Sequence, residues 1–131
     1  MKNDLATLFQ ALSDRTRQRL LHLMTDGEIC VCYFVEVLGE SQPKISRHLA
    51  YLRKAGIVAA RREGKWIHYR IVRPADAHQA RVLDCALDAM SEDRQMQRDR
   101  AMLERACCAS RLSPPLDDAP KPEFMRTRPS V

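Results

Sequence analysis

The sequence of residues 41–72, SQPKISRHLAYLRKAGIVAARREGKWIHYRIV, decides the fold. Its first half predicts a helix over residues 42–55, because Ser41 can cap the helix, Pro43 is tolerated in a first turn and Gly56 can end it. Apolar side chains recur at helical spacing in this segment and must face a core, which leaves a polar face outward. That face carries Lys and Arg near the helix start, as a helix that enters the major groove of DNA requires.

The second half of the same stretch predicts a β-hairpin. Two runs of strand-forming residues flank the turn Glu63-Gly64-Lys65, and side chains alternate in character along residues 66–71. Arg62 and Lys65 lie at the tip of this hairpin. A basic tip beside a groove-reading helix can touch the DNA backbone or the minor groove.

Charge is concentrated in the same part of the chain. Residues 41–73 contain nine Lys or Arg residues and one Glu, a net charge of +8, whereas the whole chain of 131 residues carries +5. The rest of the chain is therefore acidic. A concentrated basic segment is typical of a polyanion binder. Charge alone fits a solvated basic surface equally well. The pattern of the helix at residues 42–55 is what favours DNA binding over that alternative.

The remaining segments complete a mainly α fold with a small β-hairpin. Three short helices precede the turn at residues 40–41, and the absence of Pro and Gly from 75 to 110 predicts one long helix or two shorter ones. The order of elements is that of a winged helix-turn-helix with N- and C-terminal dimerisation helices. We assign residues 1–110 to this domain. Residues 111–131 are rich in Pro and are predicted to be a disordered tail.

Two groups of candidate residues follow from this fold. The residues expected to contact double-stranded operator DNA lie at the start and outer face of the reading helix and at the hairpin tip: Ser41, Gln42, Lys44, Ser46, Arg47, His48, Tyr51, Arg62 and Lys65. One helix reads half a site, so a homodimer is expected. The candidate dimer interface consists of apolar stripes near the two ends of the domain: Leu5, Leu8, Phe9, Val82, Leu83, Ala86, Leu87 and Met90. The alternative is that both stripes pack internally.

Five cysteines form the other chemical signal. An odd number argues against a disulfide framework, and Cys85, on the apolar side of the long helix, is expected to be buried in the protein core. Cys30 and Cys32 precede the third helix, where an extended start would point both thiols the same way and let them chelate one soft ion. Helix N-termini also favour the thiolate. Cys107-Cys108, at the end of the last helix, is a second soft-ligand cluster.

Four stretches resemble the ArsR/SmtB family of metalloregulatory repressors, most closely its arsenical-resistance branch: LSDRTR (12–17), CVC (30–32), SQPKISRHL (41–49) and REGKWIHYR (62–70). The resemblance covers about residues 5–73, and more loosely the helix that follows. It implies a homodimeric repressor bound to its own operator. It also implies that As(III) or Sb(III) is the inducer, without an organic cofactor, and that binding to thiolates near the third helix releases the DNA.

The chain departs from that family at one position. The best-known members carry a third Cys three residues after the second, and here that residue is Val35. Arsenite can exchange three hydroxyls for thiolates, so a third ligand is expected from Cys107 or Cys108, and less readily from Cys85, of the same chain or of the partner. A two-thiol site for organoarsenicals, and a separate site at Cys107-Cys108, stay open. Soft thiolates favour As(III) and Sb(III) over hard cations in every case.

Other functions fit the sequence less well. Asp76 and His78 resemble half of the zinc site of other family members, but no second half follows, so we interpret them as solvated helix-start residues. A thiol redox switch on the same fold and a non-regulatory soft-metal binder remain alternatives. No motif of a thiol enzyme, phosphate loop or metalloprotease is present, so catalysis is not expected. Without an apolar span or signal stretch, neither a membrane nor export is expected, and the protein is assigned to the cytoplasm.

Overall fold

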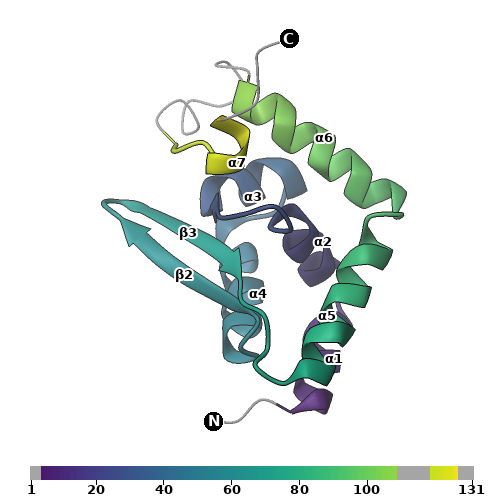
Figure 1. Cartoon of the computed structure of the whole chain (residues 1–131). Coiled ribbons are helices and arrows are strands. Elements are labelled where there is room, and N and C mark those ends of the chain that lie inside the picture. The colour runs from purple at the N-terminus through teal and green to yellow at the C-terminus, as the bar shows by residue number, and fades with distance from the viewer. Residues whose placement is uncertain (1–3, 109–118, 127–131) are drawn as a thin grey trace.

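The computed structural model describes residues 4–108 and 119–126, and it contains helices and one small sheet (Figure 1). The bounds of the elements in chain order are α1 Leu5–Leu12, α2 Arg15–Leu23, β1 Ile29–Cys30, α3 Val31–Leu38, α4 Gln42–Lys54, β2 Val58–Glu63, β3 Trp66–Ile71, α5 Ala77–Met90, α6 Arg94–Cys108 and α7 Glu123–Arg126. Within the described residues, no helix is long and apolar enough to cross a bilayer.

Helix starts are set by local side-chain caps. The carboxylate of Asp14 accepts a hydrogen bond from the Arg17 backbone N–H at 3.0 Å, and the Ser41 hydroxyl accepts one from the Lys44 N–H at 3.4 Å. Such caps satisfy donors that the first helical turn leaves free. Gly39 ends α3 in the left-handed conformation, with φ 67°. The end of α3 and the start of α4, which flank the turn of the helix-turn-helix, are therefore set by local sequence.

The sheet has three antiparallel strands in the order β1-β3-β2. The predicted hairpin is confirmed as β2 and β3, joined by a two-residue turn in which Gly64 has φ 59°. The two-residue strand β1 was not predicted, and it places Cys30 opposite His68 on β3. The segment that carries the thiols is thus part of the same sheet as the hairpin.

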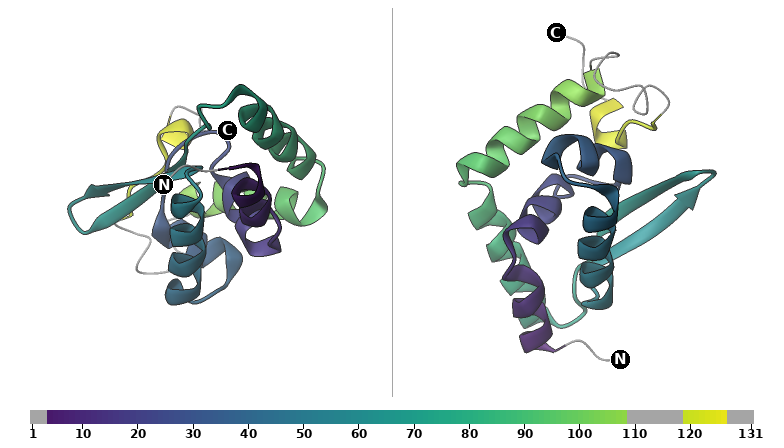
Figure 2. Two further views of the ribbon diagram at one scale, coloured as in Figure 1. Left: turned by 90° about the horizontal axis from the view of Figure 1, so that it is seen from below. Right: turned by 180° about the vertical axis from the view of Figure 1, so that it is seen from behind.

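The core lies between the first four helices and the base of the hairpin. Its largest fully buried side chains include Tyr33 and Phe34 of α3 and Ile45, Leu49 and Leu52 of α4. Figures 1 and 2 show α5 beside α1, α6 crossing over α2 and α3, and the hairpin projecting away from the helices. Packing of α4 against α2 and α3 fixes its outer face relative to the hairpin.

The C-terminal half confirms one prediction and corrects two others. Of the two arrangements expected from residue 75 onward, the chain forms two shorter helices, because α5 ends at Met90 and Asp93 starts the next helix by accepting the Met96 N–H at 3.1 Å. Cys85 is exposed on α5 rather than buried. Disorder is the wrong prediction for residues 119–126, where Ala119 is buried and α7 packs on the domain. The rest of the predicted tail lies outside the described residues.

The candidate dimer interface also needs correction. Leu8 and Leu83 are 2% and 0% exposed, and Met90 is 6% exposed, so these three side chains belong to the core of one chain. Helical periodicity shows which residues share a face, and here the neighbouring helices already cover these members of the stripe. Leu5 and Phe9, by contrast, remain 46% and 53% exposed.

Candidate DNA-reading surface and thiol site

The outer face of α4 presents the polar residues that the sequence assigned to DNA. Ser41, Gln42, Arg47 and Tyr51 are exposed, and Lys44, Ser46 and His48 are partly exposed. The opposite face of the helix is fully buried, so α4 cannot rotate without breaking the core. Lys44 forms an ion pair with Glu40 at 3.2 Å. This pair is exposed and therefore weak, so a DNA phosphate can replace Glu40 as the partner of Lys44.

Sequence reasoning missed Arg17 of α2, which organises part of this face. Its guanidinium stacks 4.1 Å from the centre of the Tyr51 ring and lies 3.5 Å from His48 Nδ1. The same group donates hydrogen bonds to the backbone carbonyls of Gln10 and Ala11 at 2.8 and 2.9 Å. Partial burial lowers the pKa of His48, with the nearby Asp14 opposing the shift. Arg17 lies in the LSDRTR stretch, which was the one available signal.

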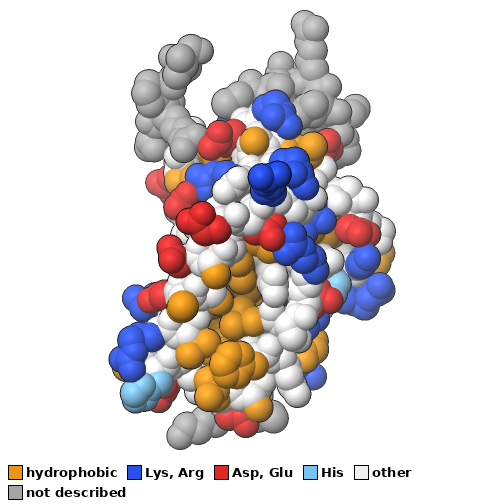
Figure 3. All heavy atoms as spheres, turned by 90° about the vertical axis from the view of Figure 1, so that its right-hand side faces the viewer, with side chains coloured by type: hydrophobic (Ala, Val, Ile, Leu, Met, Phe, Trp, Pro, Cys, Tyr) orange, Lys and Arg blue, Asp and Glu red, His pale blue; other side chains and the backbone are white. Residues whose placement is uncertain are grey.

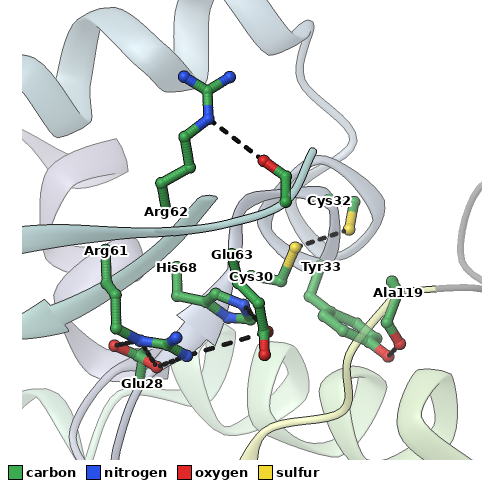
Figure 4. Close-up of polar contacts among 10 residues, drawn as sticks. Glu28, Cys30, Cys32, Tyr33, Arg61, Arg62, Glu63, His68 and Ala119 are labelled. Carbon is green, nitrogen blue, oxygen red and sulfur yellow. Dashed lines mark hydrogen bonds and ion pairs between the residues drawn. The ribbon is translucent and has the colours of Figure 1, made fainter. Parts of the chain in front are cut away.

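The hairpin tip offers two exposed cations. Arg62 donates from Nε to the Gly64 carbonyl at 3.2 Å, and Lys65 Nζ lies 5.0 Å from the centre of the Trp66 ring. Arg61 is different, because it is already paired with Glu28 through contacts of 2.7 to 3.2 Å (Figure 4). The sequence grouping of Arg62 and Lys65 as the tip is therefore confirmed in space, while Arg61 ties the hairpin to the loop before β1.

The two predicted thiol ligands lie side by side. The Sγ atoms of Cys30 and Cys32 are 3.2 Å apart (Figure 4). Cys30 occupies the cap position of α3 with extended backbone angles, φ −69° and ψ 141°, so the chain turns from strand to helix between the two residues. This geometry points both thiols the same way, as the sequence predicts for an extended helix start. Cys30 is buried and Cys32 is partly exposed.

Hydrogen bonding makes one of these thiols a thiolate near neutral pH. The Cys32 thiol donates to Cys30, and this bond, aided by backbone N–H groups and the charge of His68, lowers the pKa of Cys30 to about 6. The same bond and burial raise the pKa of Cys32. The pair therefore carries one sulfur anion and one proton, which suits a ligand that displaces that proton on binding.

A pH profile of thiol alkylation tests this assignment. Cys30 is buried, so it should react with iodoacetamide slowly, but its rate should rise with a midpoint near pH 6, because the reactive thiolate forms as pH rises through its pKa. Cys32→Ala removes the hydrogen-bond donor, so the midpoint for Cys30 should rise toward the ordinary thiol range. Peptide mass spectrometry resolves the two sites. A midpoint that stays unchanged in Cys32→Ala would contradict this cause of the shift.

The sheet brings a hydrogen-bonded His–Glu pair to the thiols. His68, 5% exposed, faces Glu63 with Nε2 2.8 Å from Oε1, and its backbone pairs with Cys30. Figure 4 shows His68, Glu63 and Cys30 together between the hairpin and the start of α3. Because Glu63 and Arg62 are neighbours on β2, the thiol site and the hairpin tip are connected through one strand pair.

Within the part of the chain that the structure describes, Cys107 is not grouped with this pair. Cys107 is 2% exposed on α6, and the side chain of Cys108 lies outside the described residues. Among the described residues, no three His, Cys, Asp or Glu side chains are close enough together to hold one ion. Asp76 and His78 are both exposed, and Asp76 caps α5 by accepting the Gln79 N–H at 2.9 Å. Their interpretation as helix-start residues is confirmed.

Fold and surface together define a winged helix DNA-binding regulator with a thiol pair where the hairpin sheet meets the helix-turn-helix. The chain belongs to the arsR family of bacterial regulatory proteins, whose sequence profile matches residues 14–60. It is a transcription regulator of the branch that includes arsenical-resistance repressors.

Three relatives illustrate the similarity. The chain is 46% identical over 78 residues to the arsenical resistance operon repressor of Escherichia coli K12, covering 59% of this chain and 67% of that one. It is 43% identical over 86 residues to the arsenic resistance transcriptional regulator ArsR2 of Pseudomonas putida KT2440, covering 65% and 75%. Among solved structures, the antimony-specific repressor AntR matches with a TM-score of 0.53 and 36% identity, covering 67% and 78%.

Proposed function

We propose that the protein is a repressor that binds operator DNA as a homodimer and leaves it when As(III) or Sb(III) binds Cys30 and Cys32. The main observation behind this proposal is that two thiols lie 3.2 Å apart in the turn that starts the helix-turn-helix. Relatives named for arsenic resistance and for antimony-specific repression support this choice of inducer. Thiolate ligands also prefer such soft ions over hard cations.

DNA binding in this proposal uses the outer face of α4 and the hairpin tip. Gln42, Ser46 and Arg47 face the bases or adjacent phosphates, and Arg62 and Lys65 contact the backbone from the side. Arg17 keeps Tyr51 and His48 in place on the same face. The expected affinity falls steeply with salt, because bound phosphates release counterions.

Release follows from where the thiols lie. Cys30 ends β1, which pairs with β3 of the hairpin, and Cys32 lies in the first turn of α3, which packs on α4. A bridging metalloid constrains both sulfurs and so changes the junction between the strand and the helix. The metalloid weakens DNA binding only to the extent that it binds the DNA-free conformation of the protein more tightly than the DNA-bound conformation.

Three-coordinate As(III) needs a third thiolate besides Cys30 and Cys32. Val35 lies on α3 where the family's third Cys is expected, and it cannot ligate. Cys107 or Cys108 of the same chain or of the partner would complete three-coordinate As(III) after a movement of the end of α6. The two-thiol alternative needs an inducer with one position already occupied by carbon, as in a trivalent organoarsenical.

Dimerisation is proposed through the exposed apolar face of α1 and α5. We define this α1–α5 face by the exposed Leu5 and Phe9 and the partly buried Val82 and Ala86, and Figure 3 shows hydrophobic side chains gathered on that side of the molecule. A patch that a single chain leaves open marks an interaction surface. Leu87 lines a separate cleft toward the base of the hairpin and is assigned there.

Phe9→Asp should convert the dimer to a monomer. Phe9 is 53% exposed in a single chain, so the charge costs the fold little but is buried without a partner in the dimer. Operator affinity should fall by about tenfold or more, because one half-site contact is lost. Sedimentation equilibrium and gel shift measure the two effects, with Phe9→Leu as the control that keeps the apolar contact. A Phe9→Asp protein that stays dimeric would contradict this interface.

The experiment that tests the function is a gel shift with the upstream duplex and increasing As(III), Sb(III), Zn(II) or peroxide. Release by micromolar As(III) or Sb(III), and not by Zn(II), supports the proposal. A protein that binds the metalloids through its thiols but shifts no duplex at moderate salt would instead be a soft-metal binder.

A redox switch is the second candidate, favoured by the same short Sγ–Sγ distance. Hydrogen peroxide would take two electrons from the pair: the two thiols would lose two protons and form one disulfide, and the peroxide would become two waters. In the gel shift, release by peroxide but not by metalloid identifies this function. Reversal by dithiothreitol distinguishes it from irreversible oxidation.

A further inference from the structure

The described part of the C-terminal tail, residues 119–126, lies across the start of α3, and we call it the strap. Its Ala119 carbonyl accepts a hydrogen bond from the Tyr33 hydroxyl at 3.3 Å (Figure 4). Ala119 is 7% and Tyr33 1% exposed, so this contact is buried. Tyr33 directly follows Cys32, and the strap therefore touches the thiol-bearing segment at its C-terminal end.

The strap also touches the other end of that segment. A Cβ built on Gly27 would lie 2.9 Å from Phe124 Cδ1, so the ring rests on backbone that has no side chain there. The guanidinium of Arg100, from α6, lies 5.2 Å from the centre of the same ring. Phe124 is thus held between α6 and the loop that leads into β1, three residues before Cys30.

The strap and the hairpin face each other across a cleft of about 550 Å³. Arg61, Glu63 and His68 line its hairpin side, and Lys121 and Glu123 line its strap side. Figures 1 and 2 show α7 between the start of α3 and the end of α6. The strap therefore fixes residues 27–33 from both flanks, on the side away from the reading helix.

We propose that the strap positions Cys30 and Cys32 for metalloid capture; this rests on the proposed function. Two sulfurs already held at 3.2 Å bind one ion with less loss of conformational freedom than two free thiols. The strap supplies that order through Phe124 and Ala119, which contact the segment at Gly27 and Tyr33 and offer no thiol of their own. Phe124 is accordingly a positioning residue rather than a ligand.

The test compares Phe124→Ala with Phe124→Tyr, which keeps the ring, and with Met102→Ala, which removes an exposed apolar side chain from α6. The full chain is titrated with antimonite, and ultraviolet thiolate–metalloid absorption gives the dissociation constant. Phe124→Ala should bind antimonite about tenfold more weakly, whereas Phe124→Tyr and Met102→Ala should match the wild type. Tyr33→Phe, which removes only the hydroxyl bond to Ala119, should give a smaller loss in the same direction.

A second readout needs no metalloid. The rate of iodoacetamide reaction at Cys30, the buried thiolate of the pair, should rise in Phe124→Ala, because a looser segment exposes the sulfur, and should return to the wild-type value in Phe124→Tyr. Antimonite binding in Phe124→Ala as tight as in the wild type would overturn the proposal. If the wild type itself captures no antimonite, the proposed function fails, and an alkylation rate unchanged by Phe124→Ala would then overturn the positioning role separately.

Discussion

Cys30→Ser and Cys32→Ser should each leave the repressor on its operator at arsenite concentrations that fully release the wild type. Serine keeps the size and hydrogen-bonding capacity of the site but removes one of two soft ligands that lie 3.2 Å apart. The concentration of arsenite needed for half-release should rise by about 100-fold, which corresponds to a loss of about 2.7 kcal/mol of metalloid binding. A gel shift with arsenite titrated against each variant measures this change.

The same variants must keep their DNA affinity for the result to be informative. The thiols lie at the start of α3 and away from the outer face of α4, so operator affinity without metalloid should stay within a few-fold of the wild type. Cys85→Ser is the matched control, because Cys85 is exposed on α5 and outside the pair. Release of Cys30→Ser or Cys32→Ser at wild-type arsenite concentrations would remove the pair from the sensing site.

Cys107→Ser extends the series to the proposed third ligand. Because Cys107 is buried apart from the pair, its loss would affect inducer binding only if the end of α6 moves on capture.

The reading helix was predictable from sequence because both of its ends are local. Ser41 caps the predicted helix of residues 42–55, and the observed helix runs over Gln42–Lys54. The hairpin was predictable for the same reason, since alternation and a Gly turn are properties of adjacent residues. The thiol pair was likewise predictable, because an extended helix start determines where two residues in one turn point.

Features that depend on distant segments were not predictable. Strand β1 has two residues and exists only through its pairing with β3, so its own pattern carries no signal. The Arg17–Tyr51 contact joins two helices. Composition marked the tail as disordered, but composition does not show that Phe124 meets a bare backbone at Gly27. Helical period similarly grouped Leu8 with Phe9 without showing which of them a neighbouring helix covers.

Asp99→Leu should destabilise the folded protein by about 3 kcal/mol, at the lower end of the range for breaking a buried ion pair. Arg19 of α2 donates from Nε and Nη2 to the two Asp99 oxygens, both at 2.8 Å, and Gln95 adds a bond at 3.0 Å. The side chains of Arg19 and Asp99 are 18% and 3% exposed. Removing the carboxylate leaves a largely buried cation without its partner, and this unpaired charge is the source of the loss.

The double variant Arg19→Met/Asp99→Leu separates the cost of leaving Arg19 unpaired from the net contribution of the ion pair to stability. Two apolar side chains leave no charge unpaired, so its stability should return to within about 1 kcal/mol of the wild type. Urea unfolding at one fixed protein concentration measures all variants, because dimerisation makes stability depend on concentration. Arg15→Ala is the surface control: Arg15 pairs with Asp93 at 2.8 Å but is 56% exposed, so solvent screens the pair and the loss of stability should be much smaller than for Asp99→Leu. Equal losses for Asp99→Leu and Arg15→Ala would mean that burial of the Arg19–Asp99 pair does not set its contribution to stability.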